Sequence, residues 1–226
     1  MSRKFNQCAV LFLHGFAAGP TATKCEFMRE RLESEGCLVD VPDLNGDSFE
    51  HMTITSQLQI IDRSLAQIDA AKHLILMGSG MGAVLATIKS QQLDRLRGLV
   101  LLSPGFGIVR RWTKLLGPEM LNDWRTTRTM DVHHYQVEQE LPLSYDFFED
   151  AQRYQTDDLK VECPTLVLHG RHDDVIPSEE SKRFAKQNPK SAELHVMDDS
   201  DMVRWLDEAW EKTDSFIQRV IAVPAR

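Results

Sequence analysis

Residues 74–83, near the middle of the chain, constrain the fold more than any other stretch. The first four residues are apolar and uncharged, which is the pattern of a strand buried on both faces. The small residues that follow from Gly78 allow a sharp turn, and Val84, Leu85 and Ile88 continue the apolar pattern at helical spacing. The stretch therefore predicts a strand, a tight turn and a helix packed close to the strand.

Glycines stand two residues before and two residues after the centre of this turn, which matches the nucleophile elbow, G-x-S-x-G. Gly78 and Gly82 are the flanking glycines, so the centre is Gly80 and not a serine. Ser79 occupies the variable position before the centre, because no glycine lies two residues from it on either side. The sequence thus predicts an elbow that lacks its hydroxyl group.

Short apolar runs alternate with amphipathic segments along most of the chain. Strands are expected at residues 8–13, 38–42, 74–77, 98–104, 164–170 and 192–197, and helices at 21–35, 54–71, 178–187 and 202–220. This alternation predicts the α/β class, with a mostly parallel sheet of about six strands and helices on both faces. Residues 105–158 depart from it, with a helix near 118–125 and extended patches at 132–135 and 141–147. We therefore expect one domain, residues 1–226, with a small lid-like insertion at about 105–158.

Three of the predicted strands end in loops that look functional. These loops are His14-Gly15-Phe16, residues 78–82 and residues 169–173. The carboxyl ends of parallel strands meet at one edge of a sheet, and sites in such sheets form there. All three loops are therefore expected at the same edge.

Composition excludes several classes of function. The 34 acidic and 26 basic residues give a formal net charge of −8, which opposes binding to the nucleic acid backbone. No run approaches the roughly 18 apolar residues of a membrane helix. The four cysteines form no CxxC pair, and Met1-Ser2-Arg3-Lys4 is no apolar leader, so we expect a cytoplasmic protein. The scattered histidines predict no metal site, and no cofactor is expected.

Motifs in the loops after five strands, taken in order, carry a family resemblance. They are Leu13-His14-Gly15-Phe16, Pro42-Asp43-Leu44, residues 77–83, Leu102-Ser103-Pro104 and residues 169–177. With these motifs the chain resembles the α/β-hydrolases, and within them the small bacterial esterase-like branch called YqiA-like. His134-Tyr135 and Glu140-Leu141-Pro142-Leu143 are similar to the lid of that branch.

The resemblance implies a Ser, Asp and His triad in that chain order, with an oxyanion hole of two backbone N–H groups. On this basis the acid falls on Asp173, and the oxyanion donors are the amides of Phe16 and Met81. The nucleophile position falls on Gly80. The histidine position falls on Met202, after a run of Asp, Ser and Asp.

Two of the three implied triad positions thus hold residues that cannot do the chemistry. Glycine offers no nucleophile, and a methionine thioether accepts no proton at neutral pH. Removing the Ser or His of a protease triad lowers kcat on the order of a million-fold. Our first hypothesis is a pseudo-hydrolase that binds a small acyl, ester or anionic ligand at the loops of His14, Gly15, Phe16, Ser79 and Met81.

Two hypotheses from other classes stay open. The first is a weak esterase in which Asp173 holds a water molecule in the space left by the serine hydroxyl, so that Asp173→Asn abolishes turnover. The second is an interaction protein whose lid surface, with Arg110, Arg111 and Trp112, contacts a protein partner.

Several of these residues also have structural explanations. Glycine at position 80 relaxes a strained turn, and Met202 fills the space of an imidazole. Asp173 braces its own loop. His14 and His169 are interpreted as structural residues of the two His-Gly turns, and Trp112 and Trp124 as lid core. A rewired pair of Ser79 with His172 or His195 would need a different turn geometry.

Overall fold

A computed structural model describes residues 4–68, 71–199 and 202–223, and only the backbone of Met202 and Val203. Six strands form one parallel sheet in the order β2-β1-β3-β4-β7-β8. Their bounds are Cys8–Leu13 for β1, Leu38–Asp40 for β2, His73–Ser79 for β3, Leu96–Leu102 for β4, Thr165–Gly170 for β7 and Ala192–Met197 for β8. The predicted six-stranded parallel sheet is confirmed.

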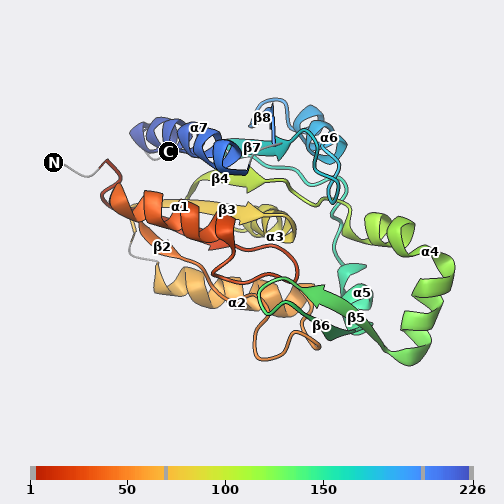
Figure 1. The fold of residues 1–226 in the computed structure, drawn as a ribbon. Helices are drawn as coiled ribbons and strands as arrows, with labels where there is room; N and C mark the ends of the chain where they lie inside the picture. Colours follow the sequence, from red (N-terminus) through yellow and green to blue (C-terminus); the bar gives the residue numbers. More distant parts are fainter. Residues whose placement is uncertain (1–3, 69–70, 200–201, 224–226) are drawn as a thin grey trace.

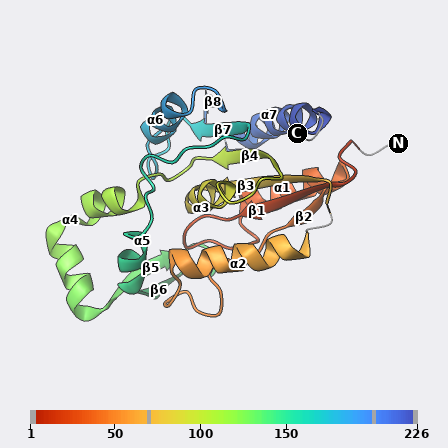
Figure 2. The ribbon, with the colours of Figure 1, turned by 180° about the vertical axis from the view of Figure 1, so that it is seen from behind.

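Helices cover both faces of this sheet (Figures 1 and 2). α1 and α7 pack on one face, and α2, α3 and α6 on the other. The bounds are Thr23–Ser34 for α1, Ile54–Gln67 for α2, Met81–Ser90 for α3, Glu179–Gln187 for α6 and Met202–Ala222 for α7. In α2, the Thr53 side chain accepts from the Ser56 N–H and the Ser56 side chain accepts from the Thr53 N–H, so a capping box fixes its start.

Strand β1 shows why the apolar runs form a central sheet. Alternate side chains of a strand point to opposite faces. Leu11 and Leu13 accordingly belong to the core under α2 and α3, whereas Val10 and Phe12 belong to the core under α1 and α7. All four side chains are fully buried, and burial of each contributes about 2 kcal/mol.

The segment between β4 and β7 holds a kinked helix, a hairpin and a short helix. They are α4 (Ile108–Thr127), β5 (Thr129–His134), β6 (Gln139–Ser144) and α5 (Asp146–Ala151). α4 consists of two helical pieces that meet at Gly117, whose φ of 72° and ψ of 172° are not helical, and the second piece contains the helix expected near 118–125. The second extended patch ends at Ser144 and not at Phe147, because α5 begins at Asp146.

Aromatic side chains fasten this segment to the loop after β1. The ring of Phe16 lies 5.0 Å from that of Trp112 and 5.6 Å from that of Phe147, centroid to centroid. Trp124 is buried and donates its indole N–H to the Leu143 carbonyl at 2.9 Å. The segment therefore lies beyond the end of the sheet to which the β3 and β4 arrows point in Figure 1.

None of the helices in the described ranges is both long enough and apolar enough to cross a membrane.

Candidate functional site

The turn between β3 and α3 has the expected strand, turn and helix geometry. β3 ends at Ser79, α3 begins at Met81, and Gly80 between them has φ 57° and ψ −114°. Side chains are rarely tolerated at such a positive φ, so glycine suits this position. The Gly80 N–H donates to the Leu102 carbonyl at 2.9 Å, which ties the turn to β4. Gly80, not Ser79, is thus the centre of the turn, and its assignment to the nucleophile position stays a prediction.

The two flanking glycines are required by packing. A Cβ on Gly82 would lie 2.1 Å from the Leu13 carbonyl oxygen, and one on Gly78 would lie 2.4 Å from the Gly82 carbonyl oxygen. A Cβ on Gly80 would instead meet nothing closer than 3.7 Å, where the nearest atom is Cδ1 of Ile176. The centre of the turn therefore has room for a Cβ atom, and its two flanking glycines do not.

The loop after β1 lies against this turn and is held by a buried histidine. The Cα of Gly15 lies 3.8 Å from the Cβ position of Gly80. His14 Nδ1 lies 2.9 Å from the Gly15 carbonyl, and Nε2 accepts from the Leu44 N–H at 2.9 Å. Because Nε2 is an acceptor here, the ring proton belongs on Nδ1 and is donated to Gly15. His14 is therefore a positioning residue for the loop, as the sequence suggested.

The amides of Phe16 and Met81 are the predicted oxyanion donors. Met81 is the first residue of α3, so its N–H has no carbonyl one turn earlier in the helix. Within residues 4–68, 71–199 and 202–223, no hydrogen bond from either amide is found. Gly15, Phe16, Ser79 and Gly80 are all half-buried, so solvent reaches the turn. The structure brings these two loops together, and the donor role of the two amides stays a prediction.

His169 fixes the loop that follows β7. Its ring is fully buried, with Nε2 donating to the Ile176 carbonyl at 2.7 Å and Nδ1 accepting from the Ser181 hydroxyl at 2.6 Å. Burial lowers the pKa of His169, so the ring stays neutral. Like His14, it is a structural histidine of a His-Gly turn.

Asp173 braces the same loop. Its Oδ1 accepts from the N–H groups of Val175 at 3.1 Å and Ile176 at 2.8 Å, an arrangement typical of Asp in turns. Its Oδ2 lies 3.8 Å from Nε2 of His169. The bracing explanation is thus supported by the contacts, while the role of Asp173 as the triad acid stays a prediction.

Met202 is the first residue of α7, and its side chain lies outside what the structure describes, as do Ser200 and Asp201. The histidine position can therefore be placed only at the start of that helix.

A rewired Ser and His pair is not visible in the described ranges. No hydrogen bond joins the Ser79 hydroxyl to His172 or His195 there. His195 lies on the edge strand β8, and burial lowers its pKa. His172 is bound to Asp199, whose Oδ1 accepts from the His172 backbone N–H at 2.8 Å and lies 3.1 Å from its Nδ1.

Among the described residues, a cluster of His172, Asp198 and Asp199 has the spacing of possible metal ligands. One ligand atom of each lies within 4.8 Å of the others. Asp199 already accepts two hydrogen bonds, and the His172 side chain is 63% exposed. These contacts join the loops after β7 and β8, and they provide no enclosed set of ligands.

Sequence reasoning missed residues that reach the turn from far along the chain. Gly105 donates its N–H to the Gly80 carbonyl at 3.0 Å, and the guanidinium of Arg111 lies against Gly105. The ammonium of Lys24 lies 4.7 Å from the ring centroid of Trp205. Burial holds the pKa of Lys24 below its ordinary value, although the charges of Asp173 and Asp199 act in the opposite direction. No local pattern marks these residues, because the contacts depend on the packing of distant elements.

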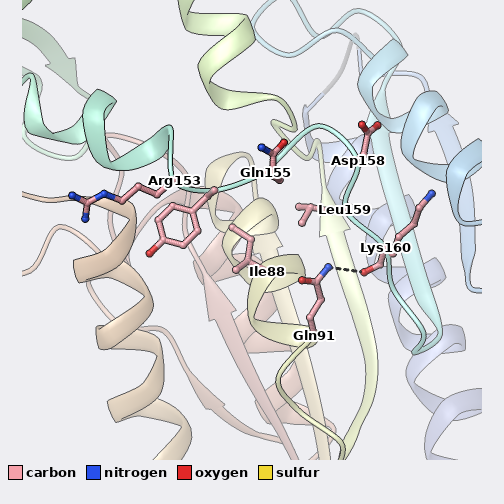
Figure 3. Close-up of a pocket in the computed structure, with 8 residues that line it drawn as sticks. Ile88, Gln91, Arg153, Gln155, Asp158, Leu159 and Lys160 are labelled. Atoms are coloured by element: carbon pink, nitrogen blue, oxygen red, sulfur yellow. Dashed lines mark hydrogen bonds between the residues drawn. The ribbon is translucent and has the colours of Figure 1, made fainter.

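Two hollows on the surface lie elsewhere. One is lined by Ile88 and Gln91 at the far end of α3 and by residues 153–155 and 158–160 of the segment before β7 (Figure 3). Gln91 donates to the Lys160 carbonyl at 3.0 Å and closes one side of it. Ile88 is eight residues from Gly80, about 12 Å along the helix, so this hollow is separate from the turn. The other is lined by Thr53, Thr55, three residues of α5 and Arg153 just after it.

Solved structures with the same arrangement of elements cover nearly the whole chain. A protein from Agrobacterium vitis S4 aligns at 20% identity over 96% of this chain and 90% of its own, with a TM-score of 0.83. Mouse alpha/beta hydrolase domain-containing protein 10 aligns at 18% identity over 94% and 90%, with a TM-score of 0.78. Est1E from Butyrivibrio proteoclasticus aligns at 18% identity over 97% and 90%, with a TM-score of 0.77.

A second structure of Est1E has ferulic acid bound and aligns with a TM-score of 0.73 at 18% identity, over 96% of this chain and 93% of its own. No curated protein sequence matches the chain. The structural likenesses show the α/β-hydrolase fold. A family model described as "Uncharacterised protein family (UPF0227)" matches residues 9–217, which confirms the YqiA-like resemblance, and the chain therefore belongs to this family.

Proposed function

We propose that this chain is a pseudo-hydrolase, which binds a small acyl, ester or anionic ligand at the β3–α3 turn and does not hydrolyse esters efficiently. The observation that carries the proposal is Gly80, which occupies the strained centre of the turn and has no hydroxyl to offer. Met202 stands at the implied histidine position. The family mechanism needs both missing groups.

Binding is supported by the groups that remain around the turn. The amides of Phe16 and Met81 are unpaired within the described residues, and such donors favour a carbonyl or an anion. A Cβ atom at Gly80 would be in ordinary van der Waals contact with Ile176 and Gly15, so a single atom fits beside the backbone of the turn. Est1E, one of the structural relatives, binds the carboxylic acid ferulic acid, which agrees with a small ligand of this class.

We further propose that residues 105–158 act as a lid over this site in a single domain of residues 1–226. The Phe16, Trp112 and Phe147 rings join the loop after β1 to α4 and α5. Apolar surface on the lid side would favour the alkyl or aryl part of an acyl ligand. No cofactor is needed for binding of this kind.

Hydrolysis of a short-chain aryl ester tests the proposal, comparing the native chain with Gly80→Ser and with Gly80→Ser combined with Met202→His. We expect the native chain to be inert and the double variant to gain far more activity than the single one, because a serine needs its base. Ester turnover by the native chain that the double variant does not improve would contradict the proposal. Loss of that turnover in Asp173→Asn would then favour the unusual esterase.

A second candidate function is protein binding through the lid. Leu115 is 80% exposed and Met120 is 50% exposed, both on α4, so the lid presents large apolar side chains to solvent. Replacing both with Gln would weaken a complex with a protein partner and leave small-ligand binding at the turn unchanged. Loss of small-ligand binding in the same variant would instead assign these residues to the lid.

A further inference from the structure

Two adjacent arginines at the start of α4 have different surroundings. Arg110 donates to Asp157 at 2.7 Å and to both carboxylate oxygens of Glu180 at 2.9 and 2.8 Å. Arg111 donates from Nη2 to the Val175 carbonyl at 2.9 Å. In the part of the chain that the structure describes, no carboxylate lies within 4 Å of the Arg111 guanidinium. One arginine is thus fully paired, and its neighbour in sequence is not.

Arg111 lies beside the turn that holds Gly80. A Cβ on Gly105 would lie 3.0 Å from Nη1 of Arg111 and 3.7 Å from the carbonyl carbon of Gly80. The guanidinium and the turn therefore both lie next to the missing side chain of this one glycine. The same Cβ position would lie 3.4 Å from Ile176 Cδ1, so the loop after β7 also lies beside Gly105.

Among the described residues, no acid forms a direct ion pair with Arg111. Its side chain is half-buried, and burial lowers its pKa, although Glu180 and Asp173 attract it from a longer distance. Glu180 is already bonded to Arg110 and Arg183, and Asp173 Oδ1 accepts two backbone N–H groups. For Arg110, by contrast, the bonds to Asp157 and Glu180 outweigh burial and raise the pKa.

A half-buried guanidinium without a counter-ion is costly, and an anion that supplies one is bound strongly. Nη2 faces the Val175 carbonyl, which leaves the N–H groups of Nη1 for a ligand on the side of Gly105. Arginine cannot lose its proton in proteins, so this charge persists at any working pH.

We propose that Arg111 recognises an anionic group of the ligand at the β3–α3 turn, so that the site selects a carboxylate or a phosphate ester over a neutral molecule of the same shape. The inference rests on the proposed function, because it assigns the ligand class of the same site. It gives Arg111 a role in specificity, and it gives Arg110 a structural role in joining α4 to α6 through Glu180.

Ligand-observed NMR titration with butyrate, propyl phosphate and the neutral butyramide tests the inference. The three probes share a propyl chain and differ in the head group. In Arg111→Gln we expect butyrate or propyl phosphate to bind about tenfold or more weakly than to the native chain, because a charge-assisted hydrogen bond is lost. Butyramide should change by less than about twofold, and whichever anion loses more identifies the head group.

Arg110→Gln is the matched control, since it removes the same charge one residue away and should leave anion binding within about twofold. Equal weakening of the anions in both variants would overturn the inference, as would an equal loss of butyramide binding in Arg111→Gln. Raising the salt concentration for the native chain gives a second measurement that needs no variant. It should weaken the two anions and not butyramide.

The outcomes separate the two proposals. Butyramide bound as tightly as both anions by the native chain would contradict the role of Arg111 and leave ligand binding at the turn standing. Failure of all three probes to bind would contradict both.

Discussion

The two sides of the candidate site are held in place by different kinds of contact. On the side of the β3–α3 turn, Gly78 and Gly82 bring backbone against backbone so closely that neither tolerates a Cβ. On the side of the loop after β7, the side chains of His169 and Asp173 hold the backbone through hydrogen bonds. We call the first the backbone-built side, because backbone atoms make its contacts. We call the second the side-chain-built side, because side chains make them.

If the chain is a pseudo-hydrolase as proposed, this difference explains how its site keeps its shape without reacting groups. The close packing of the turn needs glycines at 78 and 82 whatever residue stands at 80, because the neighbouring backbone leaves no room. His169 and Asp173 likewise serve the loop whether or not a base is present. The shape of the turn and the loop is therefore no evidence of catalysis by itself, which depends on the groups placed in the site.

The largest effect should come from adding a methyl group to the backbone-built side. In Gly82→Ala the new Cβ would lie 2.1 Å from the Leu13 carbonyl oxygen, so β1 or α3 must shift. We expect the free energy of unfolding to fall by about 3 kcal/mol or more. Urea unfolding measures it, with Gly80→Ala as the control, where the cost is backbone strain of about 1–2 kcal/mol. Equal costs for the two variants would contradict the packing argument.

The side-chain-built side should lose less from a single change. His169→Leu removes the partner of the Ser181 hydroxyl and of the Ile176 carbonyl, and we expect about 2–3 kcal/mol of lost stability in the same measurement. His51, which is exposed, is the control, and His51→Leu should change stability by less than about 0.5 kcal/mol. A loss above that of Gly82→Ala would reverse the ranking of the two sides.

The pH dependence of stability sharpens the same comparison, because only the side-chain-built side titrates. Burial holds the pKa of His169 below its ordinary value of 6.5, so the unfolded chain binds the proton more readily than the folded one. The free energy of unfolding then has its full value above about pH 6.5. It decreases as the pH falls towards the lower pKa of His169 in the folded state. His73, His134 and His195 are shifted in the same direction, first of all by burial.

Urea unfolding at several pH values between 7.5 and 5.5 measures this dependence. The native chain should lose stability across the range, and His169→Leu should lose less, since one of the four histidines no longer contributes. Gly82→Ala, which changes no titratable group, should follow the native slope at a lower stability. A slope in His169→Leu as steep as in the native chain would show that His169 takes up its proton freely in the folded state.

The sequence predicted the backbone-built side well and the side-chain-built side in part. Apolar runs and glycine spacing are local patterns, so the six strands, the turn and its centre at Gly80 followed from them. The helical piece of α4 before Gly117 did not, since the sequence predicts a helix only near 118–125. The position of Arg111 beside Gly105 and of Lys24 near Asp173 depends on contacts between distant segments, which no local pattern encodes.

The smallest effect, and the most informative about Asp173, should come from Asp173→Asn. Asparagine keeps an oxygen that accepts from the N–H groups of Val175 and Ile176, so we expect a loss of less than about 1 kcal/mol in urea unfolding. Asp173→Ala removes the acceptor and should cost about 1–2 kcal/mol. If the two variants lose stability equally, the charge itself holds the loop, through its attraction to Lys24 or Arg111. If Asp173→Asn is as stable as the native chain, the loop needs only the oxygen as an acceptor. The negative charge is then not needed for stability and is available to interact with a bound ligand.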